Sequence, residues 1–320
     1  MKVPISAMRY DITIPLLDGR VQIPNVELVS TRTGAMVFAD VPSLHSGDFG
    51  LWDLNMGYVL PAIEAGWKLV GLPLFIKRKP VYTFIFCRED AGINSPKDLE
   101  GKRIGAASYP TSITMWAQGL LQRRHGVDIS KLHWIVTNSN RAFSLHKNNP
   151  FVETATEEGK SPTDRLLDGT VDAIITDISD GKLYDLLETT PIVKRLFPDY
   201  MDEDLKVYQE MGLHAPMHQM VMSSKLDREH PDLAKKVVDA FEEAKHISYR
   251  DTLNDRAGFS IMYQRERYVE QEKVWGDPWT YGVKNNKPTI DMFLDCNVDQ
   301  GLTSKRLSIN DWLAESSLDT

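Results

Sequence analysis

Hydroxyl side chains cluster where a predicted strand gives way to a predicted helix. The stretch opens at Gly101 with a charged turn and a short apolar run, and it continues through Ser108, Tyr109, Thr111 and Ser112 into an amphipathic segment. Hydroxyl donors beside the unpaired N–H groups of a helix N-terminus create a favourable environment for an anion. We therefore expect this turn to hold a carboxylate, although Ser112 alone is equally well explained as a helix cap.

His218 is the strongest candidate for proton transfer near neutral pH. It stands in Pro216-Met-His-Gln219, directly before the apolar run Met220-Val-Met222 that is typical of a strand. Imidazole takes up and releases a proton in this pH range. A single histidine more often has a structural role. No two of the eight histidines have the spacing of a metal site, so no metal is predicted.

Three further charged side chains are candidates for ligand contacts. Arg78, in Phe75-Ile-Lys-Arg-Lys-Pro80, could bind both oxygens of a carboxylate, because guanidinium donates two parallel hydrogen bonds. The alternative is a solvated surface charge. Asp11 and Asp177 end candidate strands, where a carboxylate could accept a hydrogen bond from a phenol or amine, or could cap a following helix.

Aromatic residues could flank a flat ligand. The binding slot is expected to be lined by Trp52, Asn55 and Tyr82. The two aromatic side chains, Trp52 and Tyr82, would pack their faces on a planar ring. Trp275, Trp279 and Tyr281 are interpreted instead as packing residues near the C-terminus.

The composition excludes several classes of function. A net charge of -8 argues against nucleic acid or an anionic membrane as the main partner, although a small anion remains compatible. Only two cysteines are present, so no disulfide framework is expected. The sequence has no Gly-rich phosphate loop, serine elbow or Cys-His pairing, and no cofactor is predicted. No apolar run approaches about 18 residues and no secretory h-region opens the chain, so we expect a cytoplasmic protein.

Length and periodicity predict an α/β protein with two lobes and a ligand cleft between them. A chain of 320 residues exceeds what one core of about 250–300 residues usually serves. Short apolar runs alternate with amphipathic segments, which favours mostly parallel strands. The candidate strands are Tyr10–Pro15, Met36–Ala39, Trp67–Phe75, Tyr82–Cys87, Arg103–Ala106, His133–Val136, Ala173–Thr176 and Gln219–Ser223.

The clearest predicted helix spans Asp232–Tyr249, where apolar residues recur at helical spacing after Pro231. Other helices are expected to begin near Leu54, Ser112, Ser161 and Asp180. Residues 138–162 are interpreted as a surface excursion. The segment after Pro278 carries enough apolar residues to dock on the body of the protein.

Two segments resemble the type 2 periplasmic-binding-protein-like superfamily, of the nitrate, sulfonate and thiamine-precursor binding type. They are Ile93-Asn-Ser-Pro-Lys-Asp-Leu-Glu-Gly-Lys-Arg-Ile-Gly105 with its hydroxyl-rich turn, and Leu167-Asp-Gly-Thr-Val-Asp-Ala-Ile-Ile-Thr176. The strand that opens at Tyr82 and the return at Pro216–Ser223 predict that residues 1–85 and 210–320 form one lobe and that residues 86–209 form the other. The chain would then cross between the lobes twice.

More of the chain resembles the 4,5-dihydroxyphthalate decarboxylase family within that superfamily. The matching motifs are Tyr10-Asp11 with Leu17-Asp-Gly-Arg-Val21, Leu196-Phe-Pro-Asp-Tyr200, Pro216-Met-His218, Trp279-Thr-Tyr-Gly282 and Gln300-Gly-Leu-Thr-Ser-Lys-Arg306. The family's basic residue after Tyr-Asp is replaced by Ile12, and its Arg-His pair is replaced by Val81 and Tyr82, while Arg78 is retained.

This resemblance implies a cofactor-independent decarboxylase of a hydroxylated aromatic, phthalate-like or similarly activated carboxylic acid. His218 would donate the proton, Asp177 or Asp11 would contact the phenol, and Arg78 would hold a carboxylate that stays on the ring. The alternative is a non-catalytic solute-binding or sensor protein for a small carboxylate, because proteins of this fold mostly bind ligands. The expected partner is a small molecule in either case. Formation of a homo-oligomer is left open.

Overall fold

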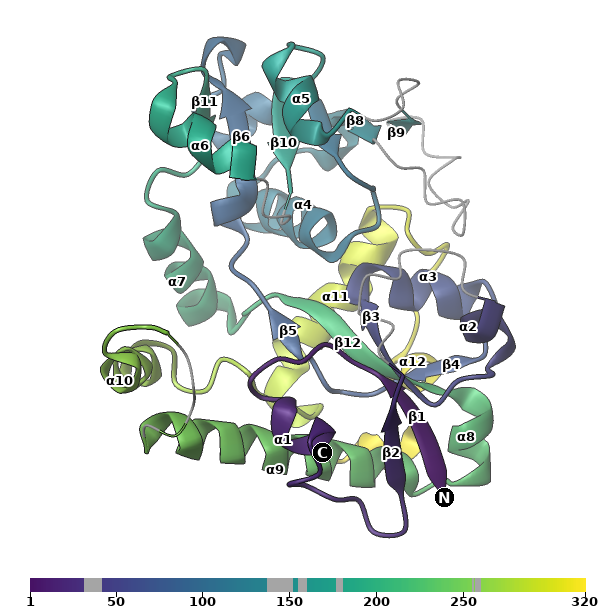
Figure 1. Cartoon of the computed structure of the whole chain (residues 1–320). Coiled ribbons are helices and arrows are strands. Elements are labelled where there is room, and N and C mark those ends of the chain that lie inside the picture. The colour runs from purple at the N-terminus through teal and green to yellow at the C-terminus, as the bar shows by residue number, and fades with distance from the viewer. Residues whose placement is uncertain (32–41, 137–151, 155–159, 177–180, 255, 257–259) are drawn as a thin grey trace. The chain divides into compact units, whose positions relative to one another are not determined.

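The structure, a computed structural model, describes all residues except 32–41, 137–151, 155–159, 177–180, 255 and 257–259 (Figure 1). The chain divides into two compact units. Unit 1 comprises Met1–Arg78, Pro216–Ile290 and Leu307–Thr320, and unit 2 comprises Lys79–Ala215 and Asp291–Arg306. The chain therefore passes between the units four times rather than twice.

Residues 291–306, predicted to lie in the first lobe, pack with unit 2. They include most of helix α11 (Lys287–Asp299). Cys296 lies so close to helix α4 (Ser112–His125) that a Cβ at Gly119 would be 2.5 Å from its Sγ. Trp116 of α4 packs against Phe293, with 6.1 Å between ring centroids. Contacts between distant segments, which sequence periodicity does not reveal, therefore set this boundary.

Unit 1 is built on a six-stranded sheet with the order β2-β1-β3-β12-β4, and β5 pairs with β12. The first three strands are mutually parallel, and β12 runs antiparallel to its neighbours. All eight residues of β12 are buried. The strands are β1 (Lys2–Ser6), β2 (Glu27–Ser30), β3 (Leu51–Asn55), β4 (Leu69–Gly71), β5 (Lys77–Arg78) and β12 (Pro216–Ser223).

One face of this sheet packs on the long helix α9 (Leu233–Leu253), as predicted from its apolar periodicity. Helix α1 (Ile14–Leu17) lies beside α9, and both contribute to the same core (Figure 1). Beyond the C-terminal end of α9 lies α10 (Gln264–Trp275), none of whose residues is buried. The other helices of this unit are α2 (Pro42–Ser46), α3 (Val59–Glu64), α8 (Ser224–Glu229) and α12 (Ile309–Trp312).

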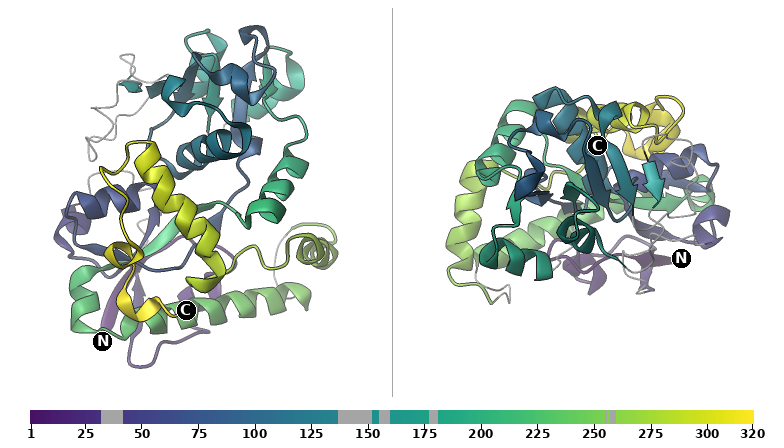
Figure 2. Two further views of the ribbon diagram at one scale, coloured as in Figure 1. Left: turned by 180° about the vertical axis from the view of Figure 1, so that it is seen from behind. Right: turned by 90° about the horizontal axis from the view of Figure 1, so that it is seen from above.

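The C-terminal segment docks on unit 1, as its apolar residues predicted. Viewed from behind, the yellow chain after Leu307 runs along this unit (Figure 2). The Trp312 indole N–H donates to Gln219 Oε1 over 3.2 Å, and Gln219 Nε2 donates to the Leu72 carbonyl over 2.7 Å. A Cβ at Gly71 would lie 2.5 Å from Trp312 Nε1, so this contact requires glycine.

Unit 2 contains a second six-stranded sheet, with the order β11-β6-β10-β7-β8-β9. Strands β10, β7, β8 and β9 are parallel, and β6 is antiparallel to both of its neighbours. The strands are β6 (Ile85–Arg88), β7 (Arg103–Ala106), β8 (His133–Val136), β9 (Val152–Thr154), β10 (Ala173–Ile175) and β11 (Val193–Arg195). The strands β7 and β8 have the predicted bounds.

Helices α4, α5 (Pro162–Leu167) and α6 (Gly181–Thr189) begin close to the positions predicted for them, and α7 (Tyr200–Met211) completes the unit. Ser161 accepts from Asp164 N in a capping box, which explains the start of α5. Cys87 and Cys296 are buried free thiols, and burial raises the pKa of each to about 12. None of the helices in the described part of the chain combines the length and apolar character that a membrane span needs.

Two predicted elements near the N-terminus were wrong. Residues Tyr10–Pro15, predicted as a strand, form a turn followed by the start of α1, with Pro15 in the first helical turn. The helix expected near Leu54 is instead the strand β3, and α3 begins at Val59. Both faces of β3 are buried, so its sequence lacks the alternation that identifies a half-exposed strand.

Other predicted segments were only partly strands. Of Trp67–Phe75, only β4 pairs as a strand, and Tyr82–Phe84 forms a 3-10 turn before β6. The predicted strand Met36–Ala39 and most of the predicted excursion 138–162 lie outside the described residues.

Candidate functional site

His218 and Asp53 form a buried pair at the centre of the unit 1 sheet. In the β3–β12 ladder Asp53 is opposite Met220 and His218 is opposite Asn55, so the two side chains are diagonal neighbours on one face. His218 Nδ1 lies 2.7 Å from Asp53 Oδ1, and their side chains are 6% and 0% exposed. Sequence analysis identified His218 but missed its carboxylate partner.

A second donor reaches Asp53 from the loop after β1. The backbone N–H of Met8 donates to Asp53 Oδ2 over 3.2 Å. This loop is fixed by Thr13, whose hydroxyl donates to the Met8 carbonyl over 2.8 Å and accepts from Tyr10 N over 3.0 Å. A buried carboxylate is tolerated when such donors replace water. Both oxygens of Asp53 thus have partners, which fixes the side chain that orients His218.

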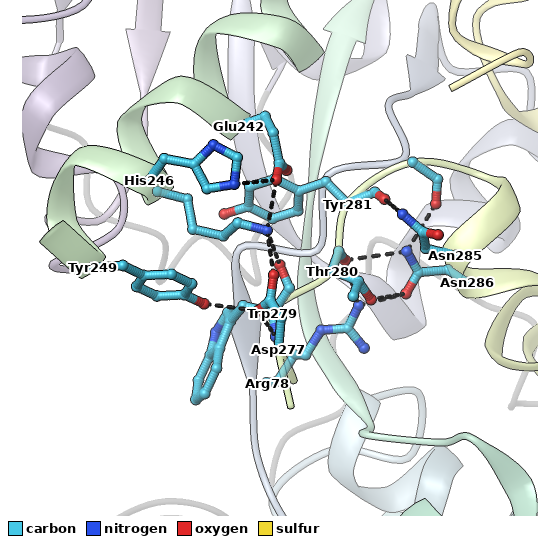
Figure 3. A network of polar contacts seen from close by, with 12 residues as sticks. Arg78, Glu242, His246, Tyr249, Asp277, Trp279, Thr280, Tyr281, Asn285 and Asn286 are labelled. Carbon is cyan, nitrogen blue, oxygen red and sulfur yellow. Dashed lines mark hydrogen bonds and ion pairs between the residues drawn. The ribbon is translucent and has the colours of Figure 1, made fainter. Parts of the chain in front are cut away.

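Arg78, on β5, lies near the His218–Asp53 pair. In the β5–β12 ladder it is opposite Pro216, two residues before His218 on β12. The guanidinium is buried, and its Nη2 donates to the Thr280 carbonyl over 2.9 Å and to Asn286 Oδ1 over 2.6 Å (Figure 3). Arg78 is therefore not the solvated surface charge considered above. Part of its donor capacity joins β5 to residues 280–286, and its role as a carboxylate clamp stays a prediction.

A buried ion-pair network fixes the next part of the same segment onto α9. Lys245 Nζ lies 2.6 Å from Asp277 Oδ2 and 2.9 Å from Glu242 Oε1. Tyr249 donates its hydroxyl proton to Asp277 Oδ1 over 2.8 Å (Figure 3). Although burial acts in the opposite direction, the hydrogen bond and charge of Lys245 lower the pKa of Asp277. We interpret this network as structural support for residues 277–281.

Asp11 lies at a separate pocket of unit 1, of about 270 Å³, whose wall includes residues of α9 and α10 and Trp279. Desolvation raises the pKa of the Asp11 carboxyl group, and hydrogen bonds from the backbone of Ile12 and of Asp11 itself oppose this change. Neither Asp53 nor His218 lines this pocket.

Trp52 and Asn55, both predicted to line a slot, do not share a face of β3. They are three positions apart on a strand, so their side chains point to opposite sides of the sheet. Trp52 packs edge-on against Phe49, with 6.4 Å between ring centroids. Asn55 lies on the face of Asp53, and its Oδ1 accepts from Gly57 N over 3.2 Å.

Tyr82 belongs to unit 2 rather than to the lobe predicted for it. It is fully buried, and its hydroxyl oxygen lies 2.8 Å from His125 Nε2. Burial raises the pKa of Tyr82 to about 12. The phenol is therefore a neutral hydrogen-bonding group at ordinary pH.

Asp204 on α7 supports the backbone that carries Tyr82. Its Oδ1 accepts from the N–H groups of Val81 and Tyr82 over 2.9 and 3.1 Å. Its buried Oδ2 has no hydrogen-bond partner among the described residues. Desolvation raises the pKa of Asp204 to about 6, although the backbone hydrogen bonds oppose this change. Sequence analysis missed this carboxylate, whose position only the packing of α7 on residues 82–84 determines.

The hydroxyl-rich turn lies before α4, as predicted, but its side chains have partners within unit 2. Thr111 is the N-cap residue, and its hydroxyl donates to the Ser108 carbonyl over 3.2 Å. Tyr109 donates to the Gln300 carbonyl over 3.0 Å. Ser108, Tyr109 and Ser112 are all buried. The carboxylate cradle in this turn stays a prediction.

Asp177, predicted as a second carboxylate of the site, lies outside the described residues. Within the described part of the chain, no group of three or more His, Cys, Asp or Glu side chains is placed to bind a metal ion.

Comparison with known proteins supports the resemblance stated from the sequence motifs. A family model described as NMT1/THI5 like matches residues 39–149. A 4,5-dihydroxyphthalate decarboxylase of Comamonas testosteroni is 26% identical over 330 residues, which cover 100% of this chain and 98% of the relative. A protein of the same name from Pseudomonas putida is 27% identical over 183 residues, or 55% of this chain and 70% of the relative.

The fold is that of the periplasmic binding proteins, as predicted. The periplasmic aliphatic sulphonate-binding protein of Escherichia coli matches 98% of this chain over 91% of its own length, with a TM-score of 0.53 and 15% identity. The sulphonate-binding protein of Xanthomonas axonopodis pv. citri, solved with bound MOPS, matches 97% of this chain over 96% of its own length, with a TM-score of 0.50 and 16% identity.

Proposed function

We propose that the protein is a decarboxylase of a hydroxylated aromatic, or similarly activated, carboxylic acid, and that His218 is its proton donor. The observation that carries the proposal is the buried His218–Asp53 pair. The relatives of Comamonas testosteroni and Pseudomonas putida, both named as decarboxylases, support the reaction class.

The pair assigns different tasks to the two imidazole nitrogens. An ionised Asp53 can only accept a hydrogen bond, so Nδ1 carries the hydrogen that points to Asp53 Oδ1. The remaining nitrogen, Nε2, is then the atom that exchanges a proton with a bound acid. Asp53 holds the ring in one orientation.

The reaction needs no external electron acceptor. Nε2 of protonated His218 donates its proton to the ring carbon that bears the departing carboxylate, and a hydroxyl group on the ring supplies the electron density for the new C–H bond. The bond to the carboxylate then breaks, carbon dioxide leaves, and its electron pair restores the aromatic ring. Water reprotonates the imidazole. A preorganised donor contributes to such a step because it is already oriented.

One further group is part of the proposal. Arg78, which belongs to the same unit as His218, would bind a carboxylate that is retained. The replacements at Ile12, Val81 and Tyr82 favour a substrate that differs from that of the named relatives.

Binding without chemistry is the competing function, because the sulphonate-binding neighbours carry the same fold. The test is incubation of the purified protein with a panel of hydroxybenzoates, phthalates and 4,5-dihydroxyphthalate while carbon dioxide is measured. Release of carbon dioxide that exceeds the release by a His218→Gln variant supports the decarboxylase. Saturable binding without release on every acid of the panel would refute it in favour of a binding protein.

A further inference from the structure

The pocket that contains Asp11 is a candidate for a second, independent ligand site in unit 1. Its volume is about 270 Å³, close to the lower end of the roughly 300–1,000 Å³ typical of small-molecule sites. Three aromatic residues line it, Tyr249 from α9, Tyr268 from α10, and Trp279. A ligand of this pocket is therefore small and has an apolar part.

The aromatic wall is held by the network described above. The rings of Tyr249 and Tyr268 are 5.3 Å apart, at an angle of 53°. Asp277 accepts from the Tyr249 hydroxyl and from Trp279 N over 2.8 and 2.9 Å (Figure 3). Because Lys245 holds Asp277 in turn, two of the three rings are fixed before any ligand arrives.

The pocket carries one negative and one positive side chain. Asp11 is exposed, lines the pocket and forms no ion pair with another described residue. Arg267 donates through Nε to the Met262 carbonyl over 3.0 Å, which fixes its guanidinium group. The terminal nitrogens of Arg267 have no partner among the described residues. Gln264 adds a buried amide nitrogen that likewise has no partner in the described part of the chain.

We propose that this pocket binds a small aminocarboxylate zwitterion, such as a free amino acid with an aromatic or large apolar side chain. Its ammonium group would meet Asp11, its carboxylate would meet Arg267, and its side chain would lie among Tyr249, Tyr268 and Trp279. Charge-assisted hydrogen bonds are stronger than neutral ones, and aromatic faces attract a cation. An ammonium group therefore matches Asp11 better than a neutral phenol does.

Ligands with a single charge fit less well. A simple carboxylate would be repelled by Asp11, and a simple amine would be repelled by Arg267. The proposal is independent of the decarboxylase, because neither His218 nor Asp53 lines the pocket.

Calorimetric titration of the full-length protein tests the proposal with four probes, L-phenylalanine, N-acetyl-L-phenylalanine, L-phenylalaninamide and 4-hydroxybenzoate. We expect L-phenylalanine to bind most tightly. Removal of either ligand charge should weaken binding by about tenfold to a hundredfold, the range expected for one charge-assisted hydrogen bond. Tighter binding of 4-hydroxybenzoate than of L-phenylalanine that is weakened in Asp11→Asn and unchanged in His218→Gln would overturn the proposal in favour of a phenol site. No saturable binding of L-phenylalanine would overturn it outright.

Variants identify the site of binding. Asp11→Asn should bind L-phenylalanine and its N-acetyl form about equally, and Arg267→Met should bind L-phenylalanine and its amide about equally. Arg265→Met is the matched control, because Arg265 lies on the same helix, outside the pocket, and donates to the Leu253 carbonyl. Binding that is unchanged in both pocket variants would show that the ligand binds elsewhere, which contradicts the proposal.

Discussion

His218 Nδ1 lies 2.7 Å from Asp53 Oδ1 although 165 positions separate the two residues in the chain. The strands β3 and β12 create this relationship, because their antiparallel register brings alternate residues of each onto one face. The pair is therefore as rigid as the central strands that carry it. Such rigidity is what a positioned proton donor requires.

Replacement of His218 by Gln should lower turnover by about 10²- to 10⁴-fold, the usual contribution of general acid catalysis. Ligand affinity should stay within severalfold, because glutamine retains polar contacts of similar size. Steady-state kinetics on the substrate identified by the acid panel measure both quantities. His246→Gln is the control, because His246 is exposed and pairs only with Glu242 among the described residues. Full activity of His218→Gln would show that the acid is another residue, with Tyr82 and Asp177 the next candidates.

Replacement of Asp53 by Asn tests its role as a positioning residue. The amide no longer holds the imidazole in one orientation and tautomer, so turnover should fall, by up to about 10⁴-fold as for the same change in other His–Asp pairs. The KM should change little, so the loss should appear in kcat. An Asp53→Asn variant that keeps full kcat, or whose loss appears in KM instead, would contradict this role. Asp53→Ala should also lower the free energy of unfolding, because Met8 N–H then loses its acceptor.

Replacement of Arg78 by Met should weaken binding of the carboxylate more than it slows turnover, because a clamp holds substrate and transition state alike. It should also lower the free energy of unfolding by about 1.5–3 kcal/mol, since a charged donor is lost at two acceptors. Asn286→Ala provides the comparison. It should lower stability, measured by urea denaturation, and leave ligand affinity almost unchanged. An Arg78→Met variant with normal affinity would limit Arg78 to a structural role.

Asp204 should make stability depend on pH. Its pKa of about 6 in the folded protein is above the ordinary value of 3.8, so the folded state favours the protonated form. The resulting stabilisation is fully present below about pH 4 and is lost as the pH rises through 6. The wild type should therefore lose up to about 3 kcal/mol relative to Asp204→Asn between pH 4 and 7.

Urea unfolding of both proteins across this pH range measures the difference. Asp202→Asn, an exposed position on the same helix, is the control. Parallel stability curves for the wild type and Asp204→Asn would refute the assignment.

Local signals in the sequence were sufficient to predict some of the strands and helices. Strand β7, the start of α4 and most of α9 follow from apolar runs, turn residues and helical spacing. The strand β3 could not be found in this way, because its Asp53 and Asn55 interrupt the apolar pattern of a strand that is buried on both faces. A sequence pattern does not distinguish a polar residue buried with a partner from one exposed to water.

The same limit applies to the site. The position of His218 before an apolar strand suggested a functional residue, but its partner is defined only by the pairing of strands that are remote in the chain. Asp204 likewise accepts hydrogen bonds from the backbone of Val81 and Tyr82 only because α7 packs against that segment. The prediction that residues 291–306 belong to the first lobe failed for the same reason, because Cys296 meets Gly119 across a long sequence separation.

The place of β12 between β3 and β4 determines when unit 1 can fold. Strands β3 and β4 are close in sequence but do not pair with each other. Strand β12, which pairs with both, follows almost all of unit 2 in the chain. During synthesis, one edge of β3 therefore stays unpaired until residues 216–223 leave the ribosome. Pairing over so long a separation is slow, because loop-closure entropy opposes it. The strand that completes the sheet also delivers His218 to Asp53, so assembly of the His218–Asp53 pair and completion of the sheet are one event.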